Sequence, residues 1–233
     1  MTVAPLLVLC ALAPEEWALS RGDWAGALGG APVLARTGMG PERAGRAVSS
    51  LLAAAPRGYG AVLVAGFGAA VAPGITPGDV VVAERVCDAS GSSLAVDSHQ
   101  PLGAALRTLG LTVHTGPLYS AGHVVRGHER RELHRSGVLA VDMESAAVLA
   151  RLPPGLPAAA VRVVVDTPER ELLRPGTVRA GLRAWRQLRA VAPALLGWHR
   201  AVAGAPSILA IPEPSDFPSM THSSKPTLPQ EAS

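Results

Sequence analysis

Four acidic residues stand just after short apolar runs and are the first candidates for chemistry: Glu15, Asp142, Glu144 and Asp166. A carboxylate at the end of a buried strand can accept hydrogen bonds from both hydroxyls of a ribose diol. Among apolar neighbours it can also keep a proton and act as an acid, or act as a general base. The alternative for Glu15 and Asp142 is an ordinary acidic position at the start of a helix.

Two glycine pairs stand where the backbone could approach a ligand closely. Thr37-Gly38-Met39-Gly40 precedes Pro41 at an expected strand-to-helix junction, where free N–H groups favour an anion or a ribose oxygen. An ordinary glycine turn is the alternative. Gly66-Phe67-Gly68 resembles part of a dinucleotide fingerprint, but position 71 is valine and Pro73 prevents a helix from starting there. We therefore expect a strand, a glycine turn, a loop and a second strand, without NAD or FAD.

The composition excludes several other chemistries. The chain of 233 residues has a single lysine, Lys225, near its end, which excludes a Walker-type phosphate loop and Schiff-base catalysis. Cys10 and Cys87 are far apart, and the spacing of cysteine and histidine fits no zinc site, so no metal is expected. Only 3% of the residues are aromatic, which is too few for the base stacking typical of nucleic-acid binding.

Short runs rich in valine and leucine alternate with helix-compatible segments and determine the expected fold. Their hydrophobicity is continuous rather than alternating, which is typical of strands buried on both faces. The sequence therefore predicts an α/β fold, a three-layer α/β/α sandwich with a mixed, largely parallel central sheet. The expected strands are Leu6–Leu12, Val33–Arg36, Ala61–Ala65, Asp79–Val86, Val113–Tyr119, Val138–Val141 and Ala158–Val165. The expected helices are Pro41–Ala55, Pro101–Leu109, Arg126–Arg135, Glu144–Leu152 and Thr177–Ala192.

This pattern predicts one catalytic domain, residues 1–202, and a disordered tail rich in proline and serine, residues 203–233. The apolar runs fall short of the roughly 20 residues that cross a membrane, and the N-terminus does not read as a signal peptide. We expect a soluble, cytoplasmic protein.

In chain order, these motifs resemble the nucleoside phosphorylase/nucleosidase superfamily. Val141–Ser145 is similar to its Val-x-Met-Glu signature, Thr37–Gly40 to its Ser-Gly-x-Gly loop, and Pro77–Val82 to its Gly-Asp-(Ile/Val)-Val-Val strand. The similarity covers about residues 4–200. It implies cleavage of the N-glycosidic bond of a purine nucleoside without a cofactor, by an enzyme that forms a homo-oligomer.

The resemblance implies a role for each matching residue. Asp166 matches the acid that protonates the departing purine at N7, and Glu15 matches the base that activates water. Glu144 matches the acid that holds the ribose 2′- and 3′-hydroxyls, with Met143 packed against the sugar. The remaining expected substrate-binding residues are Asp142, Gly66, Phe67 and Gly68, and the expected phosphate or ribose loop comprises Thr37, Gly38 and Gly40.

Finer details are most similar to the hopanoid-biosynthesis-associated branch of the superfamily. These details are Asp142, Ser145, the segment Arg162–Pro168 and the pair Arg174-Pro175. This branch implies adenosylhopane as the substrate, with adenine released and a ribosyl or phosphoribosyl hopane left. A methylthioadenosine/S-adenosylhomocysteine nucleosidase is the alternative enzyme, and a non-catalytic nucleoside-binding protein is the alternative of another class.

The chain also departs from the superfamily pattern. Val165 replaces the serine that precedes the catalytic aspartate in nucleosidases, so another group must orient Asp166. Phe67 and Val64 stand where phosphorylases bind phosphate, and His123–Val124 stands near the usual purine-stacking aromatic. Phosphate is therefore a possible co-substrate, and the sequence is compatible with both hydrolysis and phosphorolysis. Three arginines offer substitute phosphate ligands: Arg36, Arg43 and Arg126.

The helix expected from Thr177 has a basic amphipathic pattern. Apolar residues share one broad face, namely Val178, Leu182, Trp185, Leu188 and Leu196, and an adjacent stripe holds Arg179, Arg183 and Arg186. Such a pattern is typical of helices that lie on a membrane surface, which would suit a lipid-linked substrate and a site peripheral to the inner face of the membrane. The alternative is a normal surface helix that covers the sheet, and Pro193 is expected to kink or end it.

Overall fold

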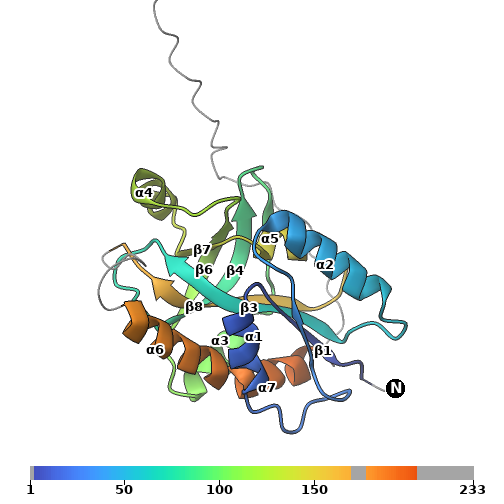
Figure 1. Ribbon diagram of the computed structural model, residues 1–233. Helices are drawn as coiled ribbons and strands as arrows, with labels where there is room; N and C mark the ends of the chain where they lie inside the picture. The colour runs from blue at the N-terminus through green and yellow to red at the C-terminus, as the bar shows by residue number, and fades with distance from the viewer. Residues whose placement is uncertain (1–2, 169–176, 204–233) are drawn as a thin grey trace, which may run out of the picture.

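The computed structural model describes residues 3–168 and 177–203, of which residues 177–180 are described by their backbone alone (Figure 1). The strands are β1 (Leu6–Cys10), β2 (Val33–Arg36), β3 (Ala61–Ala70), β4 (Val80–Asp88), β5 (Ser93–Ala95), β6 (Val113–Ser120), β7 (Ala140–Asp142) and β8 (Ala158–Asp166). The helices are α1 (Ala13–Ser20), α2 (Pro41–Ala53), α3 (His99–Thr108), α4 (Gly127–Arg135), α5 (Ser145–Leu149), α6 (Thr177–Ala190) and α7 (Ala192–Val202).

The strands form one mixed sheet that partly closes on itself. Its order is β2-β1-β3-β7-β6-β4-β5, and β8 pairs with both β3 and β4. Strands β3, β8, β4, β6 and β7 therefore form a ring, with β2–β1 and β5 as extensions. Most pairings are parallel, whereas β4–β8, β4–β5 and β3–β7 are antiparallel. The predicted fold class is confirmed.

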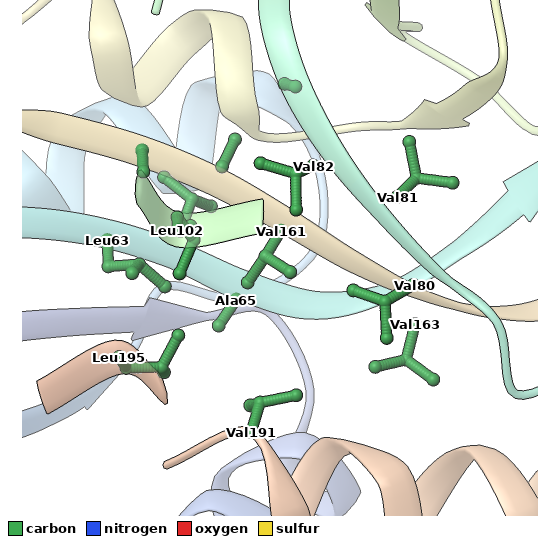
Figure 2. Close-up of a cluster of buried hydrophobic side chains, with 14 of the residues drawn as sticks. Leu63, Ala65, Val80, Val81, Val82, Leu102, Val161, Val163, Val191 and Leu195 are labelled. Carbon is green, nitrogen blue, oxygen red and sulfur yellow. The ribbon is translucent and has the colours of Figure 1, made fainter. Parts of the chain in front are cut away.

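Helices cover both sides of the sheet. Helices α1, α3, α6 and α7 gather on one side in Figure 1, and α2 and α5 lie together on the other. Between them lies a core of small branched side chains, including Leu63, Val82 and Val161, with Leu195 of α7 packed against it (Figure 2). The valine-rich runs are buried on both faces, as expected of strands between two helical layers.

The predicted glycine turn at Gly66–Gly68 is wrong. Strand β3 continues through these glycines to Ala70, because it pairs with β8 from Val62 to Ala69 and the ladder of hydrogen bonds outweighs the turn preference of glycine. The glycines serve another purpose in this strand. A Cβ at Gly66 would lie 2.6 Å from Glu15 Oε1 and 2.7 Å from Arg162 Nη1, so only glycine leaves room for these side chains.

Three elements escaped the sequence analysis. Helix α1 begins at Ala13, because Pro14 is tolerated in a first helical turn rather than ending the structure. Strand β5 has only three residues. The expected helix Thr177–Ala192 ends at Ala190, which confirms the break expected near Pro193, and a further helix, α7, follows with Pro193 in its first turn. The other predicted boundaries shift by at most three residues, apart from β3.

The amphipathic helix is buried along one stripe. Ala184, Leu188 and Val191 are fully buried against the sheet, which supports its interpretation as a covering helix. Leu182, expected on the same apolar face, is exposed instead. Within residues 3–168 and 177–203, no helix is both long and apolar enough to cross a membrane. The side chains of Val178 and Arg179, the pair Arg174-Pro175 and the predicted tail from residue 204 lie outside the described residues.

Candidate active site

The four acidic candidates lie at or just beyond the ends of strands β1, β7 and β8. Glu15 stands in the first turn of α1, directly after β1, and is buried. Its Oε2 accepts hydrogen bonds from the backbone N–H groups of Ala11 and Leu12, each at 2.8 Å. Its Oε1 accepts one from the Phe67 N–H of β3 at 2.6 Å. Glu15 therefore joins the end of β1 to the middle of β3.

Glu144 joins the glycine loop to strand β7. Its Oε1 accepts a hydrogen bond from the Gly40 N–H at 2.9 Å, across 104 positions of sequence. Burial raises the pKa of Glu144, and the nearby carboxylates of Asp142 and Glu15 add to this, whereas Arg162 and the Gly40 N–H oppose it. Met143, the preceding residue, is half-buried, and its N–H lies 3.4 Å from Glu144 Oε2.

The glycine loop is held against β1. The Thr37 N–H and Oγ1 both donate to the Cys10 carbonyl, at 2.8 and 3.2 Å. Gly38 and Gly40 have φ values of 80° and 97°, a region that favours glycine. The carbon chain of Arg43 lies against Gly38, where a Cβ would be 3.2 Å from Arg43 Cδ. The loop thus reaches Glu144 with one N–H and carries an arginine beside it.

Arg162 of β8, which the sequence analysis did not single out for the site, stands at its centre. Its side chain is only 1% exposed. Its Nε donates to Asp142 Oδ2 at 2.8 Å and its Nη2 to the same oxygen, while Nη2 lies 3.8 Å from Glu144 Oε2. Burial alone would lower the pKa of Arg162, but the charges of Asp142, Glu144 and Glu15 raise it. We call Glu15, Asp142, Glu144 and Arg162 the carboxylate–guanidinium cluster.

Asp142 is fully engaged by protein groups. Ser120 Oγ donates to its Oδ1, and Ser145 Oγ and Arg162 donate to its Oδ2. Ser120 Oγ also accepts the Ala146 N–H at 2.9 Å, which fixes the start of α5 beside β6. Asp142 therefore lies behind Arg162 rather than facing an open space.

Asp166 is paired with Arg130, a second residue that the sequence analysis missed. Arg130 Nη2 donates to Asp166 Oδ2 at 2.8 Å, and both side chains are buried. In the part of the chain that the structure describes, Asp166 Oδ1 has no hydrogen-bond partner. The ion pair supplies the orientation of Asp166 that the missing serine at position 165 left unexplained.

Asp166 adjoins the carboxylate–guanidinium cluster through β3. Ala69 of β3 pairs with Asp166 on one side and with Val141, next to Asp142, on the other. A Cβ at Gly68 would lie 2.9 Å from Arg162 Cβ, so this glycine also permits the close approach. The structure therefore brings Glu15, Asp142, Glu144 and Asp166 to one region, lined by the Gly66–Gly68 backbone.

The other candidates lie farther out. Arg36 is half-exposed and lies 3.7 Å from Glu16. Arg126 occupies the N-cap position of α4, and its side chain makes no capping hydrogen bond. His123 pairs with Glu129 at 2.9 Å, and Val124 is exposed. No group of three or more His, Cys, Asp or Glu suited to a metal ion occurs within the described residues.

This arrangement can act on a ligand that carries hydroxyl groups and a site for a proton. Buried carboxylates bind hydroxyl groups, and a carboxyl group with an unused oxygen can exchange a proton with a ligand. The sequence comparison agrees with this chemistry, since the profile described as the phosphorylase superfamily matches residues 12–190. The chain belongs to the phosphorylase superfamily. It is a nucleoside phosphorylase or nucleosidase, an enzyme that acts on N-glycosidic bonds.

Solved structures of the phosphorylase superfamily share the fold. The methylthioadenosine/S-adenosylhomocysteine nucleosidase of Neisseria meningitidis, bound to methylthio-immucillin-A, has a TM-score of 0.67 at 20% identity, covering 83% of this chain and 98% of its own. The Helicobacter pylori nucleosidase with butyl-thio-DADMe-immucillin-A has a TM-score of 0.67 at 14% identity, covering 86% and 100%. Futalosine hydrolase of the same bacterium has a TM-score of 0.64 at 15% identity, covering 85% and 98%. A search of curated proteins found no match.

Proposed function

We propose that this phosphorylase-superfamily enzyme cleaves the N-glycosidic bond of a purine nucleoside and releases the free base. The observation that carries the proposal is the carboxylate–guanidinium cluster with Asp166 beside it. Cleavage passes through an oxocarbenium-like sugar, so an acid at the leaving base and an anion near the sugar both lower the barrier.

Asp166 is the acid in this proposal. Its Oδ2 is held by Arg130, which leaves Oδ1 free to carry a proton toward N7 of the purine. Protonation of N7 lets the bond between N9 and C1′ break with its electron pair on the base. A positioned acid typically contributes about 10²–10⁴-fold to the rate.

Glu144 binds the sugar in this proposal. Its Oε1 already accepts the Gly40 N–H, and the remaining lone pairs can accept the 2′- and 3′-hydroxyls. Met143, half-buried beside it, offers an apolar contact for the ribose. Asp142 contributes indirectly, because both of its oxygens hold Arg162, Ser120 or Ser145.

We assign water as the nucleophile. A carboxylate has about four lone-pair positions, and Glu15 uses three of them on backbone N–H groups. The fourth can accept a proton from a water molecule as its oxygen attacks C1′. Arg43, beside Gly38, favours phosphate as the second candidate, because a guanidinium next to a glycine loop suits that anion.

We further propose adenosylhopane as the substrate. The support is the resemblance of Asp142, Ser145 and Arg162–Pro168 to the hopanoid-associated branch. Exposed apolar side chains also stand in the loops that supply Glu15 and the Gly40 N–H, and could meet an apolar 5′ substituent: Leu12 and Met39. The nucleosidases among the solved structures support methylthioadenosine or S-adenosylhomocysteine as the alternative substrate.

The test measures adenine released from adenosylhopane and, separately, from methylthioadenosine, with and without phosphate. Hydrolysis of adenosylhopane predicts adenine without phosphate, and ¹⁸O from labelled water in the ribosyl product. A phosphoribosyl product would replace water by phosphate as nucleophile, and release from methylthioadenosine alone would favour the alternative substrate. No adenine from either compound would contradict the enzyme and favour a nucleoside-binding protein.

Asp166→Asn tests the acid directly. The amide keeps the size of the side chain but cannot donate the proton of a carboxylic acid, so we expect kcat for adenine release to fall by about 10²–10⁴-fold. Nucleoside binding, measured by calorimetry, should be nearly unchanged. Unaltered turnover would remove Asp166 from the mechanism.

A further inference from the structure

Helices α1 and α6 present a surface that the proposed reaction does not use, with one exposed tryptophan, Trp17, and one partly buried tryptophan, Trp185. Trp17 of α1 is 55% exposed and its ring lies 4.7 Å from that of Trp185 of α6, centroid to centroid. Leu182, one turn before Trp185, is 47% exposed. Large apolar side chains that gather in this way on a surface mark a contact site more often than isolated ones do.

Arginines continue the same face. Leu182, Trp185, Arg186 and Arg189 are spaced at i, i+3, i+4 and i+7, which places them on one side of α6. Trp17 and Arg21 have the equivalent i, i+4 spacing along α1. We call these six residues the tryptophan–arginine face.

The two helices contact each other along this face, and the contacting residues follow the same order in both. Trp17 meets Trp185, and four residues later in each helix Arg189 Nε donates to the Arg21 carbonyl at 2.9 Å. The aromatic side chains therefore form one end of the face and the arginines form the other. The aromatic end is the one nearer the candidate active site, because Glu15 stands in the first turn of α1.

The arginine end lines an open surface hollow of about 550 Å³. Arg21, Arg186 and Arg189 line it together with a single acid, Asp23. None of the three arginines forms an ion pair with another residue that the structure describes. Three cations against one anion leave a charge excess of +2 at the hollow, which suits an anionic group such as a phosphate.

Most of the face lies outside the core; of its six residues only Trp185 is partly buried and packs against the core. Ala184 and Leu188 form the buried stripe of α6, continued by Val191 just after it, and Ala18 and Leu19 anchor α1. The Arg21 guanidinium lies 5.9 Å from the centre of the Trp17 ring, in the range of a cation–π contact, and both groups stay open to solvent. The exposed side chains can therefore be changed without removing the core contacts of either helix.

We propose that the tryptophan–arginine face docks on the surface of an anionic phospholipid bilayer. Tryptophan rings settle at the level of the lipid headgroups, and arginines bind their phosphates. The combination of an aromatic end and a cationic hollow on two contacting helices fits this occupant by shape and charge. Docking would bring the edge of the candidate active site close to the lipid, and it does not depend on which reaction the site performs.

The experiment measures binding of the full-length protein to vesicles by sedimentation. Vesicles of phosphatidylcholine alone are compared with vesicles of phosphatidylcholine and phosphatidylglycerol at a roughly 7:3 molar ratio. We expect binding to the anionic vesicles only, weakening from about 0.1 M to about 0.5 M salt because charges at the surface are screened.

Variants locate the surface. Each basic residue at an anionic membrane contributes about fivefold to the partition coefficient, so Arg186→Gln with Arg189→Gln should lower it by about 25-fold. Trp17→Ser with Leu182→Ser should lower it by at least about tenfold through the lost apolar contact. Arg46→Gln with Arg57→Gln, which removes two exposed arginines on α2 and the turn after it, is the charge-matched control and should leave binding within about twofold.

Three results would overturn the proposal. The first is equal binding to neutral and anionic vesicles, or no binding to either. The second is an equal loss in the arginine variant and in its charge-matched control, since this would show attraction by overall charge alone. The third is a dimer that becomes a monomer in the Trp17→Ser, Leu182→Ser variant, since the face would then bind a second copy of the chain. Adenine release from methylthioadenosine reports on the reaction separately.

Discussion

Arg162 shows how one buried charge organises the candidate site. Removing a guanidinium from water costs several kcal/mol unless nearby groups compensate, and a single carboxylate rarely suffices. Here Asp142 accepts two of its N–H groups, and the charges of Glu144 and Glu15 add to the compensation. The same cation limits how far burial raises the pKa of Glu144. Arg162 thus permits three carboxylates to be buried within one region, and its own position depends on all three.

Arg130 offers a sharper test at the scale of one residue. We expect Arg130→Gln to lower kcat for adenine release by about 10–100-fold, with little change in KM, because it misplaces Asp166 without touching the sugar. In an Asp166→Asn background the same substitution should change kcat hardly at all, since a residue that acts only through Asp166 has nothing left to position. Steady-state kinetics of the four proteins provide the measurement.

The control for this cycle is Arg131→Gln, the exposed neighbour on α4, which should behave as the unchanged protein. Multiplicative losses in the double variant would show that Arg130 acts independently of Asp166. Thermal unfolding distinguishes a general loss of structure, because Arg130→Gln leaves Asp166 buried without its cation, whereas the double variant does not.

The sequence indicated the acids of the site but not their cationic partners. Glu15, Glu144 and Asp166 follow apolar runs, so their place at strand ends could be predicted. Arg162 was recognisable in principle, as the one charge between two buried runs of β8. Arg130 was not, because α4 carries charged or histidine side chains on all sides, and which side is buried depends on where the helix packs.

At the scale of elements, β3 and α1 show where local patterns mislead. Glycine and proline usually mark turns, yet in β3 the pairing with β8 carries the strand past Gly66 and Gly68. In α1, Pro14 stands in the first turn, where its missing N–H costs nothing. Val33–Arg36 was predicted to the residue although it is only partly buried, and the ends of most longer elements were predicted to within about two or three residues.

The buried His199 of helix α7 leads us to expect that the free energy of unfolding depends on pH. His199 is fully buried, and burial lowers its pKa, helped by Arg200 and opposed by the Ala4 carbonyl. The unfolded chain therefore binds a proton more readily than the folded one. Stability should fall as the pH drops below about 6.5, by at most about 1.4 kcal/mol per pH unit from this group. Urea unfolding at several pH values measures it.

The comparison needs two variants. His199→Gln cannot titrate, so it should lose that part of the slope between neutral and mildly acidic pH, whatever its stability at neutral pH. His134→Gln, exposed on α4, should retain the slope of the unchanged protein. Identical slopes in all three proteins would show that His199 does not resist protonation.

At the scale of the whole molecule, the ring of strands brings together site residues that lie far apart in the sequence. Residues from position 15 to position 166 reach it from β1, β3, β7 and β8, and the contact between Gly40 and Glu144 spans 104 positions. No shorter segment contains the cluster. The family and the fold follow from the chain as a whole, whereas the substrate depends on loops at its edge.

The extent of the core predicts how much of the C-terminal end can be removed without unfolding the protein. Core contacts of the described residues extend to Val202 of α7, where Leu195 and Trp198 are fully buried. Ending the chain after residue 203 should leave the Tm and adenine release nearly unchanged. Ending it after residue 191 removes side chains worth about 2–3 kcal/mol each, a large share of a total stability of about 5–15 kcal/mol. The variant that ends after residue 191 should show no cooperative unfolding transition in calorimetry. A large loss of Tm in the variant that ends after residue 203 would show instead that residues beyond 203 belong to the folded domain.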